Sequence, residues 1–274
     1  MESGEIRGSR KKSRRLCCIV AVLAVVLLLI IAIALGVSLS RRGNEFKNTF
    51  MQRCEKFEGN NCAAIWDAFQ KAYVDRDQCD VPPEAYDSLI EAAPLETSCN
   101  RMMFWSKTKD VAQDLAAKGD CFLTVEKTLL GSVLDGLTWC GKRGSDETLT
   151  TGCPKWNDCV KNPVRSFWNR VSAEFGDAAC GDVTAMLNGS IPTPFDQTSI
   201  FASIEVKRFK SSKVKKLDIV LVTEMNSVTN CTNKSLQDLQ NMLDKGIIYS
   251  CLEVQKSQIQ KCSSDPNKSC GSCW

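Results

Sequence analysis

The apolar positions of the chain form one long uninterrupted run and several shorter periodic segments. The long run, Leu16–Leu39, holds no charged residue over 24 positions. At 1.5 Å per residue, a helix of that length crosses a bilayer core of about 30 Å. A cleavable signal peptide has a shorter apolar core and a cleavage site of small residues, whereas Arg41 and Arg42 follow this run. The pattern predicts a transmembrane signal anchor over residues 16–40.

The two flanks of this run differ in charge. Residues 1–15 contain six basic and two acidic side chains, and the more basic flank of an anchor stays in the cytoplasm. We therefore predict a cytoplasmic tail at 1–15, a membrane-proximal linker at 41–50 and an extracellular domain at 51–274. This topology is that of a single-pass type II protein of the plasma membrane.

The net charge of +3 belongs to the membrane end of the chain. Residues 1–42 hold eight basic and two acidic side chains, so the remainder is slightly acidic. Such a domain is not expected to bind nucleic acid. The local exception, Lys207–Lys216, has six basic residues in ten. It is either a solvated edge before a strand or a patch for an anionic polymer.

Several segments beyond the anchor have helical periodicity. Ala63–Ala72, Phe104–Ala117 and Leu236–Leu243 are candidate helices. Asn162 and Pro163 form an N-cap and first-turn pair. They open a predicted helix whose apolar face comprises Val164, Phe167, Trp168, Val171 and Phe175.

The predicted strands lie in the C-terminal half. Leu217–Thr223 is β-branched and almost continuously apolar, as expected of a central buried strand. Ile200–Val206 is a second candidate, and it contains Glu205. An acid inside an apolar strand is a local inconsistency typical of functional or strained sites, although it also fits the outward-facing position of an edge strand. The N-terminal part of the domain is therefore predicted to be mainly helical and the C-terminal part α/β.

The stretch Val125–Gly141 places Glu126 and Asp135 at the two ends of an apolar face. Leu130, Val133, Leu134 and Leu137 fall at helical spacing on that face. The pattern is compatible with one wall of a functional site. Taken alone, it fits better a half-buried helix whose carboxylates are solvated or capping, because carboxylates are usually exposed.

Cysteine and histidine usage limits the chemistry. The chain has 16 cysteines, and C-x-x-C occurs only at Cys270–Cys273, so a disulfide framework in an oxidising compartment is favoured over a zinc module. Histidine is absent, which excludes Ser–His and Cys–His nucleophile systems and nearly every common transition-metal site. Sequons for N-glycosylation, which suit a secretory-pathway protein, occur at Asn188, Asn230, Asn233 and Asn267.

Three tryptophans lie on apolar faces: Trp105, Trp139 and Trp168. Each fits an ordinary core position. With the segments around them, however, they form a specific pattern, and the sequence resembles the ADP-ribosyl cyclase/cyclic ADP-ribose hydrolase family over about residues 50–270. The matching segments are F-W-S-K at Phe104–Lys107, T-L-L-G at Thr128–Gly131, L-T-W-C-G at Leu137–Gly141, C-P-x-W at Cys153–Trp156, N-P-V-x-x-F-W at Asn162–Trp168, M-L-N-G-S at Met186–Ser190 and S-I-F-A-S-I-E-V at Ser199–Val206.

This resemblance implies a disulfide-rich α/β (α+β) fold of two interleaved lobes. The helical N-terminal lobe would comprise 51–98 and 124–179. The C-terminal lobe, at 99–123 and 180–274, would contain a short parallel sheet flanked by helices. The implied function is an ectoenzyme that cleaves the nicotinamide–ribose bond of NAD, or of NADP, to ADP-ribose and cyclic ADP-ribose. NAD is then a substrate, and no cofactor or metal is expected. The alternative is a catalytically weak surface receptor or adhesion glycoprotein of the same fold. Protein partners and a homodimer are left open.

The resemblance also implies roles for particular residues. Glu205 becomes the catalytic carboxylate, and Glu126 the acid that influences cyclisation against hydrolysis. Trp105 and Trp168 become aromatic walls of the pocket. Asp135 becomes the acid near the nicotinamide carboxamide.

The implied phosphate and ribose contacts are Ser106, Lys107 and Ser172. Here the sequence departs from the family, which often has Arg at Lys107, Thr at Ile200 and Asp at Lys127. Losing the Thr hydroxyl removes a phosphate hydrogen bond, and Lys lacks the bidentate fork of Arg. These departures bear on phosphate binding and leave the reaction class unchanged.

The disulfides implied by the resemblance are Cys54–Cys62, Cys79–Cys159, Cys99–Cys180, Cys140–Cys153, Cys231–Cys251 and Cys262–Cys270. Cys121 and Cys273 are extra to that pattern. They would either pair with each other or stay free.

Overall fold

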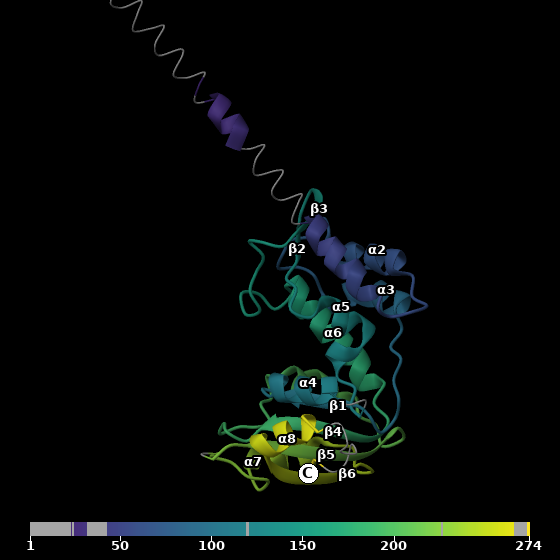
Figure 1. The fold of residues 1–274 in the computed structure, drawn as a ribbon, viewed down its shortest axis with the longest axis vertical. Helices are drawn as coiled ribbons and strands as arrows, with labels where there is room; N and C mark the ends of the chain where they lie inside the picture. The colour runs from purple at the N-terminus through teal and green to yellow at the C-terminus, as the bar shows by residue number, and fades with distance from the viewer. Residues whose placement is uncertain (1–22, 24, 32–42, 119–120, 226, 266–272) are drawn as a thin grey trace, which may run out of the picture. The chain divides into compact units, whose positions relative to one another are not determined.

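The computed structural model describes residues 23, 25–31, 43–118, 121–225, 227–265 and 273–274 (Figure 1). The chain divides into two units, Met1–Lys47 and Asn48–Trp274. The predicted tail and most of the predicted anchor at 16–40 lie outside the described residues. Within the described part, residues 25–31 are helical, and no helix is both long and apolar enough to span a membrane.

The first half of the second unit is mainly helical. Its helices pack around the ring of Phe69, which lies 4.9–5.4 Å from the rings of Phe50, Tyr73 and Trp139. Trp139 is fully buried and donates from its indole Nε1 to the Tyr86 hydroxyl at 3.0 Å, so it is a core residue. The elements are α2 (Cys62–Tyr73), η1 (Pro83–Tyr86), α3 (Asp87–Ala92), η2 (Val125–Lys127), α5 (Leu129–Leu134), α6 (Pro163–Asp177) and a two-stranded sheet of β2 (Cys140–Lys142) and β3 (Ser145–Leu149).

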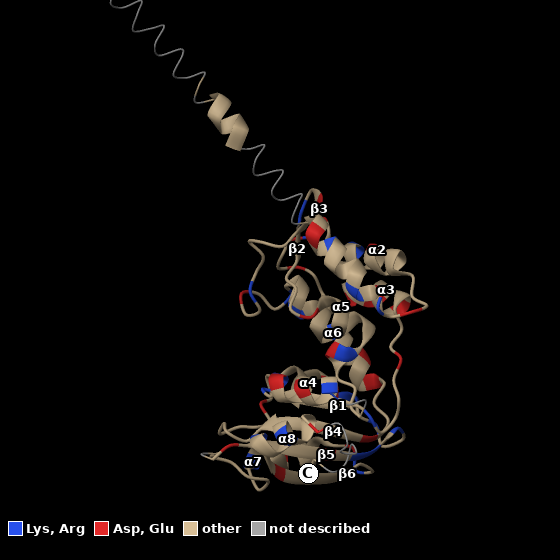
Figure 2. Ribbon diagram, viewed as in Figure 1, with Lys and Arg blue, Asp and Glu red and all other residues tan. Residues whose placement is uncertain are grey.

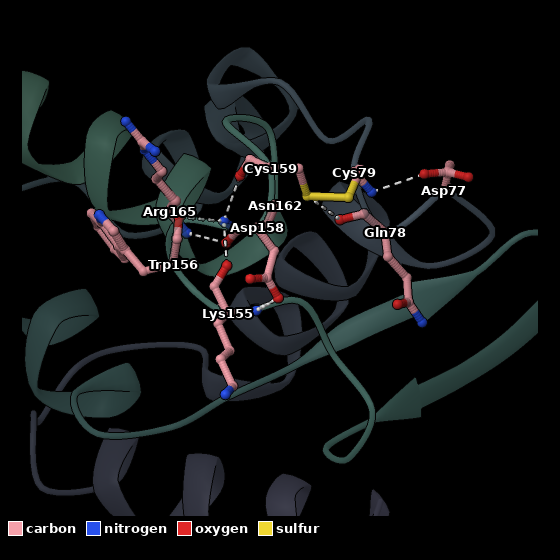
Figure 3. The surroundings of a disulfide bond; sticks show 9 residues. All are labelled: Asp77, Gln78, Cys79, Lys155, Trp156, Asp158, Cys159, Asn162 and Arg165. Atoms are coloured by element: carbon pink, nitrogen blue, oxygen red, sulfur yellow. Dashed lines mark hydrogen bonds between the residues drawn. A yellow bond between two sulfur atoms is a disulfide. The ribbon is translucent and has the colours of Figure 1, made fainter.

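Helix α6 begins where the sequence predicts. Pro163 occupies the first turn, and the side-chain oxygen of Asn162 accepts a hydrogen bond from the backbone nitrogen of Arg165 at 2.9 Å. The side-chain nitrogen of Asn162 donates to the carbonyl of Cys159 at 2.8 Å, and Cys159 is bonded to Cys79 (Figure 3). The start of α6 is thereby fixed both by its cap and by a disulfide.

The second half is built on a four-stranded parallel sheet in the order β1-β4-β5-β6. The predicted strand Leu217–Thr223 forms most of β5, which is paired on both sides, so its central position is confirmed. The early strand β1 lies beside β4, and residues 103–106 therefore belong to this sheet. The strands are β1 (Met103–Ser106), β4 (Gly181–Asn188), β5 (Val214–Thr223) and β6 (Ile248–Gln255).

Helices α4 (Lys109–Lys118) and α8 (Lys256–Ser263) cover one face of the sheet (Figure 1). Leu115 of α4 and Ile259 of α8 join Met186, Val220 and Val254 of the strands in one apolar cluster. Helix α7 (Lys234–Met242) corresponds to the predicted helix at 236–243. The molecule is thus a mixed α/β protein with a parallel sheet and several disulfides.

Two predicted elements are wrong. Phe104–Ala117 is not one helix, because β1 ends at Ser106 and α4 starts at Lys109. Between them, Lys107 has a left-handed backbone conformation, with a φ of +57°. Ile200–Val206 is not a strand but a π-helical turn at Phe201–Glu205 followed by a 3-10 turn. The side-chain oxygen of Ser199 accepts from the backbone nitrogen of Ala202 at 3.1 Å. This local cap favours a helical turn over an extended strand.

Five of the expected disulfides are present: Cys54–Cys62, Cys79–Cys159, Cys99–Cys180, Cys140–Cys153 and Cys231–Cys251. The expected Cys262–Cys270 bond is wrong, because Cys262 is bonded to Cys273. The ring of Trp274 stacks on Phe122 at 5.6 Å, and Cys273 packs in the same apolar cluster as Ile259 of α8. Cys121 is also disulfide-bonded, so neither extra cysteine is free.

Candidate active site

Every residue that the sequence analysis assigned to the site lines one cavity of about 530 Å³. This volume lies within the range of small-molecule sites, roughly 300–1,000 Å³. The walls come from the end of β1, from η2, from the segment after α5, from α6 and from residues 199–205. The predicted residues on the cavity are Trp105, Ser106, Lys107, Glu126, Asp135, Trp168, Ser172 and Glu205.

Glu205 lies at the end of the π-helical turn and is only 5% exposed. The turn can approach α6 closely because Gly176 faces it: a Cβ at Gly176 would lie 2.9 Å from the Glu205 carbonyl oxygen. Single π-helical turns are frequent at functional sites. Burial raises the pKa of Glu205 to about 8; a hydrogen bond with Ser172 lowers it, and the nearby charge of Glu126 raises it further.

Glu126 and Trp105 form a hydrogen-bonded pair in the same cavity. The indole Nε1 of Trp105 donates to both carboxylate oxygens of Glu126, at 3.1 and 3.2 Å. Glu126 stands on η2, which packs tightly on α5: a Cβ at Gly131 would lie 1.9 Å from the Val125 carbonyl oxygen. The glycine in T-L-L-G therefore permits the close approach that positions Glu126.

Trp168 and Ser172 are four residues apart on α6 and so share one face of the helix. Trp168 packs edge-on against the buried ring of Phe167 at 5.2 Å. Ser172 is buried beside Glu205. Helix α6 thus supplies an aromatic wall and the hydroxyl partner of the buried acid.

The rim of the cavity carries two ion pairs. Lys107 contacts Asp196 with an Nζ–Oδ2 distance of 2.7 Å, and Lys109 contacts Asp135 at 2.8 Å. The side-chain nitrogen of Asn188 donates to the Lys107 carbonyl at 3.3 Å, which supports the left-handed backbone at that residue. Sequence reasoning did not identify Asp196 or Lys109, because no periodic or motif signal marks either residue.

Trp156 and Ile200 also line the cavity. Trp156 was noted only as part of a motif; it is 40% exposed at the edge of the site, with the Arg165 guanidinium 5.7 Å from its ring centre (Figure 3). Ile200 adds an apolar surface where the family often has a hydroxyl. Lys127 instead lines a separate cavity of about 170 Å³, and its ammonium donates to the Ala116 carbonyl.

Two side chains of the basic run Lys207–Lys216 interact with the C-terminal end of α6. Arg208 contacts Asp177 with an Nε–Oδ2 distance of 3.2 Å, and Lys213 donates to the Asp177 carbonyl at 2.9 Å. Cations at a helix C-terminus are stabilising. Basic and acidic positions are interspersed along the helices of this unit (Figure 2).

Three of the four sequons can be placed. Asn188 ends β4 and is half-buried, Asn230 is exposed, and Asn233 caps α7. Asn267 lies outside the described residues. Among the residues that are described, no group of three or more His, Cys, Asp or Glu side chains could hold a metal ion.

Comparison with known proteins identifies the fold and its relatives. The ADP-ribosyl cyclase family model matches residues 43–271. Mouse ADP-ribosyl cyclase/cyclic ADP-ribose hydrolase 1 is 31% identical over 234 residues, which cover 81% of this chain and 77% of the relative. Porcine CD38 in complex with a covalent intermediate superposes with a TM-score of 0.72 at 34% identity, covering 77% of this chain and 96% of that chain.

An ADP-ribosyl cyclase complexed with N1-cIDPR gives a TM-score of 0.74 at 28% identity. The superposition covers 84% of this chain and 97% of that chain. In each of these three comparisons the match covers at least 77% of this chain and at least 77% of the relative. The chain belongs to the ADP-ribosyl cyclase family.

Proposed function

We propose that this protein cleaves the nicotinamide–ribose bond of NAD and forms ADP-ribose and cyclic ADP-ribose. The observation that carries the proposal is the buried carboxyl group of Glu205, in a cavity walled by the indoles of Trp105 and Trp168. The names of the relatives, ADP-ribosyl cyclase/cyclic ADP-ribose hydrolase, support the same reaction.

The reaction suits a site without histidine. The nicotinamide of NAD is already a pyridinium cation, so it leaves as a neutral molecule with the electrons of the broken bond and needs no general acid. Two-carboxylate glycosidases, in contrast, must protonate their leaving group. What the protein must stabilise is the positive charge that develops on the ribose. The ionised carboxylate of Glu205 supplies the opposite charge in a buried, preorganised position.

The ribosyl group then follows one of two routes. Water that attacks the anomeric carbon gives ADP-ribose and a proton, whereas the adenine of the same molecule gives cyclic ADP-ribose. The porcine CD38 complex contains a covalent intermediate. By analogy, the Glu205 carboxylate is the group that would bond to the anomeric carbon and be released by either acceptor.

The aromatic walls have two roles in this proposal. An indole face attracts a pyridinium ring by about 0.5–2 kcal/mol through cation–π interaction, and it keeps water from the reacting ribose. The hydrogen bond from Trp105 to Glu126 holds this indole in place. We assign to Glu126 the partition between cyclisation and hydrolysis, because its carboxylate is held by Trp105 in the same cavity and its charge acts on Glu205.

The remaining predicted residues would bind the rest of the substrate. Asp135 reaches the cavity from the end of α5, where it would meet the nicotinamide carboxamide. Ser106 and Lys107 line the cavity at the end of β1, where they would contact the phosphates of NAD or NADP. Ser172, which hydrogen-bonds Glu205, would contact the ribose. No cofactor or metal enters this scheme.

The proposed location is the outer face of the plasma membrane, with the chain anchored through residues 16–40 as a type II glycoprotein. Disulfides distributed over residues 54–273 require an oxidising compartment, which supports this topology. Of the three sequon asparagines that the structure describes, Asn230 has the most exposed side chain and would be the most open to a glycan.

The decisive experiment is product analysis with NAD for the full-length protein in detergent, compared with its Glu205→Gln variant. Wild-type protein should release nicotinamide, and the variant should lose at least about 100-fold in rate, as expected when a charge-stabilising group is removed. Glu147→Gln is the matched control, since Glu147 is exposed on β3. A folded wild-type protein that releases no nicotinamide would instead favour the receptor or adhesion role.

A further inference from the structure

The ion pair between Lys107 and Asp196 occupies the place where the substrate phosphates are expected. Lys107 lines the cavity, yet its ammonium is 2.7 Å from Asp196 Oδ2. The other oxygen of Asp196 accepts hydrogen bonds from the backbone nitrogen of Thr198 at 2.9 Å and from its hydroxyl at 2.7 Å. The carboxylate is therefore fixed in the turn that leads into residues 199–205.

We infer that Asp196 is a specificity-determining residue that competes with the substrate phosphates for Lys107. The inference rests on the proposed function. It deepens that function by assigning a role to a residue that does not itself line the cavity. In the free protein the ammonium is neutralised by a neighbouring carboxylate. A bound pyrophosphate must displace this carboxylate before it can pair with Lys107.

The geometry supports exchange rather than a permanent contact. The Lys107 side chain is 50% exposed and that of Asp196 is 26% exposed. Exposed ion pairs contribute little and open readily. The backbone of Lys107 is held independently, through its carbonyl, by Asn188. The ammonium can therefore turn from Asp196 to a phosphate while the end of β1 stays in place.

The ion pair also connects the phosphate contact to the catalytic segment. Asp196 accepts a backbone hydrogen bond from Ser199 at 2.9 Å, and Ser199 caps the turn that ends in Glu205. The hydrogen bond from Lys107 is the largest cause of the low pKa of Asp196, about 2, and the hydrogen bonds from Thr198 add to it. The carboxylate is therefore ionised at neutral pH, where it competes with the phosphates for Lys107.

The test is the Asp196→Asn variant of the full-length protein at low ionic strength, where exposed charges are least screened. Asparagine retains an oxygen for Thr198 and removes the charge. The KM for NAD and the Kd for ADP-ribose, which carries both phosphates, should each fall by about two- to fivefold, the range of an exposed ion pair. The KM for nicotinamide riboside, which has the same scissile bond and no phosphate, should not change.

A double-mutant cycle completes the test. In a Lys107→Gln background, Asp196→Asn should no longer lower the Kd for ADP-ribose. An increase in this Kd on Asp196→Asn alone would mean that Asp196 orients Lys107 for the phosphate, and would overturn the inference. An equal change with nicotinamide riboside would also overturn it. The binding measurement does not depend on turnover, so absence of nicotinamide release would contradict the proposed function alone.

Discussion

At the scale of single residues, the candidate site depends on two carboxylates in different surroundings. Glu205 is buried beside a hydroxyl, whereas Glu126 accepts two contacts from an indole. A carboxyl group whose pKa is strongly raised by burial in a cavity, as that of Glu205 is, is typical of a functional site. Two predictions follow from this difference between Glu205 and Glu126.

The rate of nicotinamide release should report the ionisation of Glu205. Because the ionised form is required and the pKa of Glu205 is about 8, kcat/KM should rise with pH and level off above about pH 8. A bound pyridinium favours the ionised carboxylate, so kcat should level off at lower pH. Glu126→Gln removes a like charge and should shift the kcat/KM inflection to lower pH. A flat kcat/KM profile from about pH 6 to 9 would contradict this assignment.

Trp105→Phe should change the product ratio more than the total rate. Phenylalanine retains an aromatic wall but cannot donate to Glu126, whose carboxylate would lose both indole contacts. The ratio of cyclic ADP-ribose to ADP-ribose should therefore shift in the same direction as in Glu126→Gln. Trp168→Phe is the matched control, since none of the hydrogen bonds found among the described residues joins Trp168 to Glu126. Equal shifts in both variants would exclude the hydrogen bond as the cause.

At the scale of elements, the site depends on helical segments brought into close contact by glycines. Gly131 allows η2 to meet α5, and Gly176 allows the π-helical turn to meet α6. The sequence predicted α2, the start of α6 and the centre of β5 because their periodicity, cap and β-branched residues agree. It mispredicted residues 200–206, because a short apolar run does not distinguish a strand from a helical turn.

Gly176→Ala should test the contact between α6 and the π-helical turn that carries Glu205. Alanine alone would favour a helix by roughly 1 kcal/mol. At this position, however, its Cβ would lie 2.9 Å from the Glu205 carbonyl oxygen and 3.1 Å from the Glu205 Cα. We expect overpacking to dominate, with a loss of about 1–3 kcal/mol in the free energy of unfolding and severalfold slower nicotinamide release.

Chemical denaturation and a nicotinamide assay of the same preparation measure the two effects. Asn169→Ala, at a half-buried position of the same helix, provides the comparison for helix propensity. A more stable and fully active Gly176→Ala protein would show that the turn can move away without consequence.

At the scale of the whole molecule, the buried acid should reduce stability at neutral pH. The folded-state pKa of Glu205, about 8, lies above the ordinary glutamate pKa of 4.5 that applies to the unfolded chain. Below about pH 4.5 both states are protonated and no penalty exists. As pH rises toward 8 the unfolded chain loses its proton first, so folding becomes progressively less favourable, by an amount on the order of a few kcal/mol.

Glu205→Gln should therefore melt at a higher temperature than wild-type protein at pH 7–8. The difference in melting temperature between the two proteins should disappear at about pH 4. Calorimetry of both proteins across this range measures the effect. The exposed control Glu147→Gln should show no such pH-dependent gap. If the Glu205→Gln gap were constant with pH, the difference would come from packing and not from ionisation.

The sequence by itself determined the kinds of groups available and several elements. The absence of histidine limited the chemistry to carboxylates, hydroxyls, cations and aromatics, and the motif set led to Glu205, Glu126, Trp105 and Trp168. Local signals such as the Asn162–Pro163 cap are encoded in neighbouring residues and can be predicted directly.

Tertiary structure alone decided what depends on contacts between distant segments. The Cys262–Cys273 bond is accompanied by the stacking of Trp274 on Phe122, a residue far away in the sequence. The high pKa of Glu205 follows from its burial beside α6. The pairing of Lys107 with Asp196 depends on a turn that lies about ninety residues later in the chain. Burial and charge proximity are properties of the folded chain. The motifs of the sequence therefore pointed to the residues of the candidate site, and packing set the electrostatics of Glu205 and Asp196.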